Sequence, residues 1–240
     1  AYGFTKDVVT TSENGDSATQ GNVALQDLVV GEEVTFLLTA TIGEGTTNNV
    51  IITDTLPFTA ATGDADGVLE FVSSQITGIG VGITSISNGL TVGSNGVVGG
   101  ANSEVITYDF GSVVSTGNNV ADSTITIQVV ARVANLAQNQ DGDLLTNTGE
   151  LSIHGGVDTV TFTDIAQVEV FEPEIVANKT ITSIPAEPDS GDTVTYQITI
   201  NNPTAFDAYD STFVDTMPPE VLLQTGTFTA NSSVSGDVSA

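Results

Sequence analysis

Alternation of apolar and polar residues is the dominant pattern along this chain. In VTFLLTATI the apolar positions are Val34, Phe36, Leu38, Ala40 and Ile42, and most of the residues between them are Thr. VTYQITI repeats the pattern at Val194, Tyr196, Ile198 and Ile200, and STITIQVVARV repeats it at Ile125, Ile127, Val129, Ala131 and Val133. A period of two places successive side chains on opposite faces of a strand. The pattern therefore predicts half-buried β-strands, with Arg132 on an outer face.

Clusters of Gly, Asn, Ser and Asp separate these stretches, and no segment carries the apolar stripe of a helix. They read GEGTTNN, GDADG, GSNGVVGGANS and NQDGD, which are typical of turns and loops. The chain has 240 residues, of which 39% are hydrophobic and 6% aromatic, so a core of Val, Ile, Leu and Ala can form in one large or two ordinary domains. The sequence predicts an all-β protein.

Two parts of the chain repeat the same series of residues. GEEVTFLLT at residues 31–39 matches GDTVTYQIT at residues 191–199. A lysine precedes each match, Lys6 or Lys179, and an Asp-containing segment follows it, ITDTLP or FVDTMP. Such self-similarity indicates a repeated structural unit. We expect a complete first repeat at residues 1–172, which ends at the FEPEI junction, and the N-terminal part of a second repeat at residues 173–240.

In these residues the chain resembles the DUF11-type repeats, and the related isopeptide-forming domains, of large bacterial and archaeal surface proteins and fimbrial adhesins. The resemblance rests on the lysine, GDTVTYQITINN and DTMPP, and it is close over residues 175–222. It is looser in the first repeat, where Phe36 replaces the usual Tyr and insertions follow Lys6 and Pro57. The resemblance implies tandem immunoglobulin-like β-sandwiches, the second incomplete, strung as an extracellular stalk with Lys-to-Asn cross-links inside each domain.

The alternation also tests whether the cross-linking groups face inward. Four sets of residues share a face: Phe4, Lys6 and Val8; Ile52, Asp54 and Leu56; Ala177, Lys179 and Ile181; Phe213, Asp215 and Met217. The reaction needs an uncharged amine and a protonated carboxyl group, and burial lowers the pKa of lysine and raises that of aspartate. We expect Lys6 and Asp54 to be the nucleophile and the assisting acid, with Lys179 and Asp215 as their equivalents in the second repeat.

The acceptor should be an asparagine on a late strand of the first repeat. Asn147 in LLTNTGELSI has the same parity as its apolar neighbours, and the resemblance also places the reactive asparagine in a late L-x-N context. We prefer it to Asn135 and Asn139, which lie at a strand end or in a loop. Asn231 comes too early to serve the second repeat, whose acceptor we expect beyond Ala240.

Two simpler interpretations fit the same parity. Lys6 and Asp54 could form a buried ion pair, or the lysine stem could run along the edge of the sandwich with its amine in water. The chain has two lysines, and both occupy the same position in a repeat with an inward Asp after each. This placement favours the cross-link, which requires no cofactor.

The acidic residues bear on partners and metals. Thirty acidic residues against three basic ones give a formal charge of −27, which excludes nucleic acid and anionic membrane surfaces as partners. Calcium is the natural companion of such a chain, and two loops have spaced ligands for it: Asn139, Asp141 and Asp143, and Asp64 and Asp66. A solvated acidic turn is the alternative, and we favour it because Asp-Gly is ordinary turn chemistry.

Other features narrow the class of protein. The chain has no cysteine, no run of apolar residues long enough to span a membrane, and a start, AYGF, that lacks the parts of a signal peptide. We therefore expect a mature or excised piece of a longer protein. His154 is the only histidine, so neither a catalytic triad nor a histidine zinc site can be assembled around it.

Two functions remain. The first is a structural or adhesive module of an extracellular surface protein or filament, with neighbouring repeats of the same or identical chains as partners. The second is a carbohydrate- or protein-binding adhesin domain, assisted by calcium, with its ligand surface in the insertion at residues 59–102. An enzyme acting on outside substrates has the least support, because no set of nucleophile, base and orienting group can be assembled.

Overall fold

A computed structural model describes residues 1–12, 26–58, 68–100, 104–155, 158–204, 206–209 and 211–224. Compact packing divides the chain into residues 1–209 and residues 210–240, and each unit is described by itself. Asp64, Asp66 and Asn231 lie outside the described residues. The boundary that we expect at residue 172 stays a prediction.

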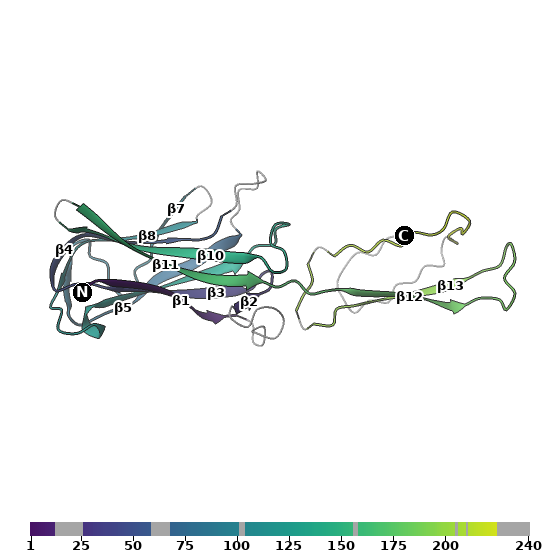
Figure 1. Ribbon diagram of the computed structural model, residues 1–240, viewed down its shortest axis with the longest axis horizontal. Coiled ribbons are helices and arrows are strands. Elements are labelled where there is room, and N and C mark those ends of the chain that lie inside the picture. The colour runs from purple at the N-terminus through teal and green to yellow at the C-terminus, as the bar shows by residue number, and fades with distance from the viewer. Residues whose placement is uncertain are drawn as a thin grey trace. The chain divides into compact units, whose positions relative to one another are not determined.

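Strands account for nearly all regular structure in the described chain, as Figure 1 shows. The strands are β1 (Gly3–Thr11), β2 (Gln26–Leu28), β3 (Glu33–Thr41), β4 (Gly45–Thr55), β5 (Leu69–Ile79), β6 (Ile83–Ile86), β7 (Val97–Gly99), β8 (Val105–Ser115), β9 (Thr124–Val133), β10 (Leu144–Gly155), β11 (Asp158–Val170), β12 (Val176–Ser183) and β13 (Thr195–Asn201). One short 3-10 helix, η1 (Ala121–Ser123), precedes β9. The all-β prediction is confirmed.

Two sheets pack face to face over residues 1–170. The first has the order β1-β3-β9-β5, and the second has the order β2-β11-β10-β4-β8-β6, with β7 also paired to β8. Neighbouring strands are antiparallel except β2 and β11, which are parallel. The first repeat is therefore a β-sandwich, and its inner faces form one core.

β1 starts at one end of the sandwich, and β11 ends at the other (Figure 1). Tyr2, just before β1, lies with its ring centroid 6.4 Å from that of Phe162 in the early part of β11. Val170, which ends β11, is paired with Leu28 of β2. The start of β1 and the end of β11 thus lie at opposite ends of the strands.

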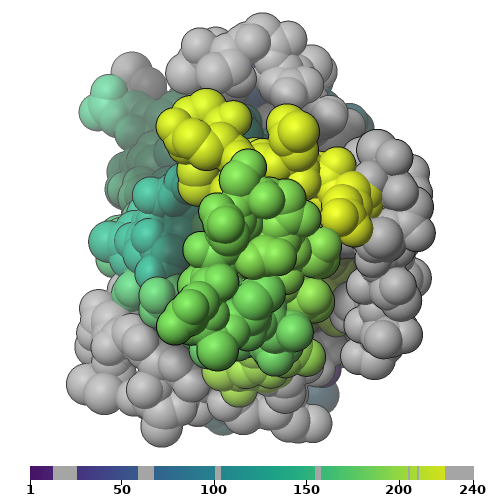
Figure 2. Space-filling view, turned by 90° about the vertical axis from the view of Figure 1, so that its right-hand side faces the viewer, coloured from purple at the N-terminus to yellow at the C-terminus, as the bar shows by residue number. Residues whose placement is uncertain are grey.

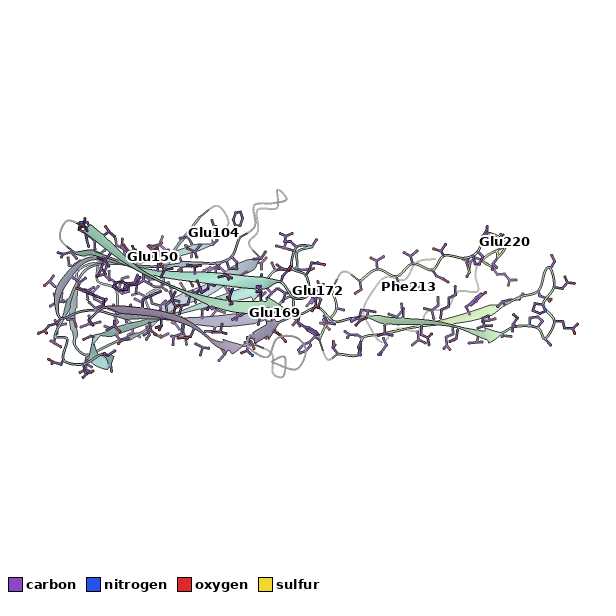
Figure 3. All side chains as sticks on the ribbon, viewed as in Figure 1. Glu104, Glu150, Glu169, Glu172, Phe213 and Glu220 are labelled. Atoms are coloured by element: carbon purple, nitrogen blue, oxygen red, sulfur yellow. The ribbon has the colours of Figure 1, made fainter. Side chains whose placement is uncertain are left out.

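The core follows the predicted alternation. In β3 and the residue after it, Val34, Phe36, Leu38, Ala40 and Ile42 are all buried, and the inward residues of β9 are buried in the same way. Figure 3 shows the side chains gathered between the two sheets. Arg132 is on the outer face as predicted, where its guanidinium donates a 2.7 Å hydrogen bond to Glu33. The apolar alternation alone is thus enough to define the inner faces of these strands.

The insertion contributes strands to both sheets, which the sequence analysis did not anticipate. Among its described residues, β5 pairs with β9 at one edge of the first sheet. Its other two strands, β6 and β7, pair with β8 of the second sheet. The insertion is therefore part of the sandwich and not only a surface added at one end.

The sequence repeat corresponds to a repeated pair of strands. In β1 and β3, Lys6 is opposite Leu38, Val8 is opposite Phe36, and a bulge follows Val8. In β12 and β13, Lys179 is opposite Ile198, Ile181 is opposite Tyr196, and a bulge follows Ile181. The two lysines thus occupy equivalent positions in pairs that share register and bulge.

The two strand pairs differ in burial, which corrects the prediction that Lys179 and Asp215 face a core. β12 and β13 form a two-stranded sheet of their own, and every residue of β12, Lys179 included, is exposed. The space-filling view shows this pair at the surface in green (Figure 2). Asp215, in the other unit, is exposed as well. Both were predicted to face a core, but among the described residues β12 and β13 pair only with each other, and their side chains are not covered as those of β1 and β3 are.

A substitution on β9 tests the assignment of its two faces. Ile127 is fully buried, so Ile127→Ala should lower the free energy of unfolding by about 2–5 kcal/mol. Arg132→Ala on the same strand should leave the denaturation midpoint close to that of the unsubstituted protein, because exposed ion pairs contribute little. Chemical denaturation followed by circular dichroism measures both. Equal midpoints for the two variants would mean that the inner face is wrongly assigned.

Candidate cross-linking site

Three polar residues from three strands meet inside the sandwich. Lys6 comes from β1 in the first sheet, and Asp54 and Asn147 come from β4 and β10 in the second. Their exposed fractions are 3%, 1% and 0%. The predicted inward orientation is thus observed for all three, and we refer to them together as the cross-link site.

The Asp54 carboxyl group bridges the other two side chains. Its Oδ1 accepts a short hydrogen bond from Lys6 Nζ, with which it also forms an ion pair. Its Oδ2 accepts a longer hydrogen bond, 3.4 Å, from Asn147 Nδ2. Asn147 Oδ1 is buried without a hydrogen-bond partner among the described residues. One carboxyl group therefore holds the amine and the amide at the same point of the core.

The surroundings favour the uncharged forms of both ionisable groups. Burial lowers the pKa of Lys6, although the negative charge of Asp54 opposes this shift. Burial likewise raises the pKa of Asp54, against the opposing effects of Lys6 and of the hydrogen bond from Asn147. Both shifts favour movement of the shared proton from Nζ to the carboxyl group. Transfer of that proton would give a free amine and a carboxylic acid.

Close packing leaves little freedom for the lysine side chain. Lys6 Nζ lies 5.0 Å from the centroid of the Phe36 ring. Gly149 lies two residues after Asn147 on β10 and is opposite Asp54 on β4. A Cβ at residue 149 would lie 2.9 Å from the Phe4 ring and 3.2 Å from Lys6 Cδ. The absence of a side chain at Gly149 therefore lets Lys6 pass over β10 to reach Asp54.

Gly149 is the residue of this site that the sequence analysis missed. Its signal is present in LLTNTGELSI, because Gly149 has the inward parity of Leu145, Asn147 and Leu151. A glycine within a strand marks a bulge or a close approach of another group. Here the approaching group is the lysine itself.

The second repeat has the same strand pair but no buried counterpart of this site among the described residues. Lys179 Nζ lies 4.5 Å from the centroid of the Tyr196 ring, as Lys6 lies near Phe36. Lys179 and Asp215 are both exposed and belong to different units. Their reactivity stays a prediction.

In the NQDGD loop, the predicted calcium ligands bond to the backbone. Asn139 is fully buried, and its Nδ2 donates to the carbonyl oxygens of Val68 at 3.1 Å and Ala134 at 2.7 Å. Asp143 accepts from the Gln140 amide, and Asp141 accepts from the Glu172 amide. Within the described ranges, no three His, Cys, Asp or Glu residues are grouped to hold a metal ion. Calcium binding stays a prediction.

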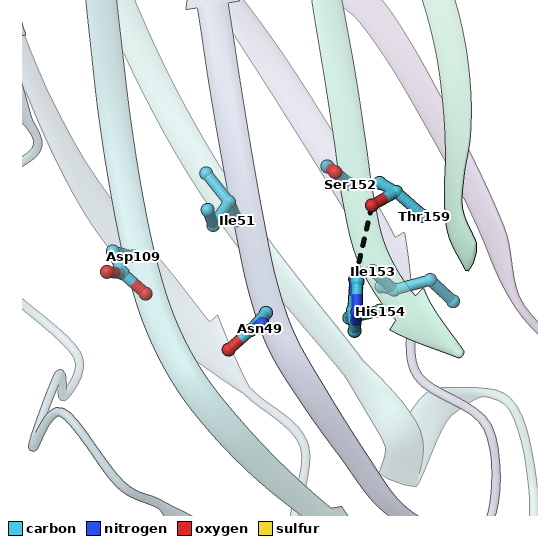
Figure 4. A pocket seen from close by; sticks show the side chains of 7 residues that line it. All are labelled: Asn49, Ile51, Asp109, Ser152, Ile153, His154 and Thr159. Atoms are coloured by element: carbon cyan, nitrogen blue, oxygen red, sulfur yellow. Dashed lines mark hydrogen bonds between the residues drawn. The ribbon is translucent and has the colours of Figure 1, made fainter. Parts of the chain in front are cut away.

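His154 lines a hollow of about 220 Å³ on the second sheet, shown in Figure 4. Its Nδ1 forms a 3.1 Å hydrogen bond with Thr159 Oγ1. Asn49, the one described non-glycine residue with positive φ (47°), and Asp109 lie on neighbouring strands of the same hollow. The hollow brings together polar groups that could bind a ligand, but nothing in it marks a particular one.

No protein-family model and no curated protein sequence matches the chain. Several solved structures are similar to it. A variant of BcpA, the major pilin subunit of Bacillus cereus, is 13% identical with a TM-score of 0.42, over 74% of this chain and 42% of that chain. ACE19, the collagen-binding subdomain of the Enterococcus faecalis surface protein ACE, is 8% identical with a TM-score of 0.36, over 70% and 95%. The 35 kDa C-terminal fragment of the Streptococcus agalactiae major pilin GBS80 is 15% identical with a TM-score of 0.40, over 75% and 58%.

No helix in the described part of the chain is long and apolar enough to cross a bilayer.

Substitution of Gly149 tests the packing of the cross-link site. Gly149→Ala should lower the melting temperature, with an overpacking penalty of about 1–3 kcal/mol, because the new methyl group meets Phe4 and Lys6. Gly3→Ala on β1 is the control, since its Cβ would lie at an ordinary 3.9 Å from Thr41. Differential scanning calorimetry compares them. If both variants melt together, Lys6 does not lie over residue 149 in the way described.

Substitution of Asn139 separates a backbone clamp from a metal ligand. Asn139→Ala should reduce stability by about 1–3 kcal/mol in chelator and in calcium alike, because two buried side-chain hydrogen bonds are lost at about 0.5–1.5 kcal/mol each, while the two carbonyl groups keep their backbone donors. Asn135→Ala, at an exposed residue nearby, should have little effect. If calcium stabilises the unsubstituted protein and not Asn139→Ala, Asn139 is a ligand. If melts in chelator and calcium superimpose for the unsubstituted protein, the acidic loops are solvated turns.

Proposed function

We propose that this chain is a structural or adhesive module of an extracellular surface protein or filament, and that an isopeptide bond between Lys6 and Asn147 stiffens it. We also propose that it belongs with the DUF11-type and isopeptide-forming repeats that it resembles. One observation carries the proposal: a buried lysine and a buried asparagine contact the two oxygens of one buried aspartate. These are the three groups that the reaction requires.

The arrangement fits the cross-link better than it fits an ion pair. An ion pair of Lys6 and Asp54 does not require a buried asparagine beside it, and Asn147 Oδ1 has no hydrogen-bond partner among the described residues. A buried polar atom without a hydrogen bond costs about 1–3 kcal/mol. Rotation of the amide exchanges Nδ2 and Oδ1, and Oδ1 then accepts a hydrogen bond from the protonated Asp54 carboxyl group. That hydrogen bond polarises the carbonyl group toward attack.

The reaction balances without any outside reagent. Neutral Lys6 Nζ attacks Asn147 Cγ, a new C–N bond forms, and the bond from Cγ to Nδ2 breaks. The proton that Nζ loses passes through Asp54 to Nδ2, which leaves as ammonia. Asp54 is protonated before and after the reaction. The product is a neutral amide, which has a smaller desolvation penalty than a buried pair of charges.

The bond would join the two sheets covalently. Lys6 lies on the first strand of the first sheet, and Asn147 lies on β10 in the middle of the second. The chain between them would become a closed ring that includes most strands of the sandwich. Mechanical stiffening of this kind suits a module within a long surface protein, with neighbouring repeats or identical chains as its partners. No action as an enzyme on outside substrates is proposed.

A second candidate function is ligand binding by the insertion. Val81, Val92 and Val97 lie in its described part and are 85%, 58% and 75% exposed. A protein or glycan partner that binds the insertion would contact exposed residues of this kind. Glycan-array and cell-binding assays on the full chain distinguish this function from a purely structural one, because a purely structural module gives no signal in either assay.

Intact-mass measurement tests the leading proposal. The purified protein should be lighter than its sequence by the mass of one ammonia, and peptide mapping should find residues 6 and 147 in one branched peptide. Lys6→Arg and Asp54→Ala should restore the full mass. Their stability should fall by several kcal/mol on the chain-entropy account developed for disulfides, because a loop from residue 6 to residue 147 is no longer closed.

Lys179→Arg is the matched control for Lys6→Arg. It changes the other lysine of the chain, at the equivalent position of the second repeat, and should leave the mass deficit intact. A full-mass unsubstituted protein would refute the cross-link. A deficit that survives in Lys6→Arg would assign the loss of ammonia to another residue.

A further inference from the structure

Asp164 is a second acidic residue that contacts Lys6, and it contacts the backbone. It lies on β11 of the second sheet, where its Oδ2 accepts a 2.9 Å hydrogen bond from the Lys6 amide nitrogen. Its Oδ1 accepts a 3.0 Å hydrogen bond from the Ile165 amide, which orients the carboxylate. This side chain therefore ties β1, in one sheet, to β11, in the other.

Asp164 and Asp54 occupy the two ends of one row across the second sheet. Asp164 is opposite Gly149, and Gly149 is opposite Asp54, so the row crosses β11, β10 and β4. Strands in a sheet are about 4.8 Å apart, which separates the two aspartates by about 10 Å. The backbone of Lys6 is bound at one end of the row, and its Nζ is bound at the other.

The middle of the row completes this geometry. Gly149 leaves the space that Lys6 Cδ occupies, as the short distance to a Cβ at residue 149 shows. The lysine side chain thus lies across β10, with its backbone held by Asp164 and its Nζ held by Asp54. Any shift of the Lys6 backbone changes how far Nζ reaches toward Asn147.

The position of the Lys6 backbone has to be held in place because β1 is an edge strand. Among the described strands of the first sheet, β1 is paired to β3 alone. A slip of one residue in the register of such a strand turns every side chain to the other face, and Lys6 would then face solvent. The hydrogen bond to Asp164 holds the Lys6 amide on the side of β1 that β3 does not occupy. An inward-pointing carboxylate also makes this edge unsuitable for pairing with another strand.

We propose that Asp164 is a positioning residue for the cross-link: its hydrogen bond to the Lys6 backbone places Nζ within reach of Asn147. The inference rests on the proposed function. The negative charge of Asp164 has a separate and opposite effect, because it raises the pKa of Lys6 and so disfavours the free amine. Position and charge are therefore separable by substitution.

The test measures the rate of bond formation in the full chain. Each variant is translated in vitro in a short pulse and quenched at intervals in acidic denaturant, and intact mass gives the fraction that has lost ammonia. Asp164→Ala removes the acceptor and should slow the reaction by about 10-fold or more, since a misplacement of 1 Å can cost that much. Asp164→Asn keeps one acceptor oxygen for the Lys6 amide without the charge, although it loses the hydrogen bond from the Ile165 amide, and it should react faster than Asp164→Ala. Asp158→Ala, at an exposed residue of β11, is the control.

The outcomes separate this inference from the proposed function. An unsubstituted protein that keeps its full mass refutes the proposed function itself. An unsubstituted protein that loses ammonia while Asp164→Ala reacts at the same rate overturns only the role of Asp164. If Asp164→Ala does not fold, the comparison moves to Asp164→Asn and Asp164→Gln, because Gln carries the same amide one carbon farther out. Equal rates for these two would also overturn the role.

General loss of stability is excluded by a second measurement. Asp164→Ala and Asp164→Asn are each combined with Asn147→Ala, which cannot form the bond, and their melting temperatures are compared. A positioning role predicts that rates differ far more than these melting temperatures imply. Slowing of Asp164→Asn to the rate of Asp164→Ala would show that the charge matters and not the hydrogen bond, and would contradict the proposal.

Discussion

The candidate cross-link site depends on the burial of one amine with one carboxyl group between two sheets. Water is excluded from both groups, so each is driven toward its neutral form, and the two shifts favour transfer of the same proton. The rest of the local structure makes this burial feasible: Phe36 lies beside the amine, and Gly149 leaves space for the lysine stem. The desolvation penalty is large when these two groups are buried as charges and smaller when they are buried as neutral groups.

Much of this site could be predicted from the sequence because a strand has a period of two. The parity of Lys6, Asp54 and Asn147 with their apolar neighbours was enough to place all three side chains in the core. Parity cannot tell which strands are adjacent, so the contact of Gly149 with Lys6 and that of Asp164 with the Lys6 backbone needed the structure. Parity also cannot tell whether a face is covered, which is why Lys179 was wrongly expected to be buried.

The strand pairs β1–β3 and β12–β13 also show that matching strands can differ in burial. They share a register, a bulge and a lysine near an aromatic ring, yet one pair is buried and the other exposed. Burial of the lysine therefore depends on the sheet that lies opposite and not on the strands that carry the residues. Likewise, the insertion looked from sequence like an addition to the sandwich, whereas its strands pair with β8 and β9 at sheet edges.

The entry and exit of the chain at opposite ends of the sandwich determine how the first repeat bears tension. A force applied through the two ends acts along β1 and β11, parallel to the strands and perpendicular to the hydrogen bonds of the antiparallel pairs. The hydrogen bonds between β1 and β3 that precede Lys6 are then loaded in shear and must break together, and the proposed bond from Lys6 to Asn147 would carry the force beyond them. Unzipping, in which they would break one after another, requires a pull across the strands that this entry and exit do not provide.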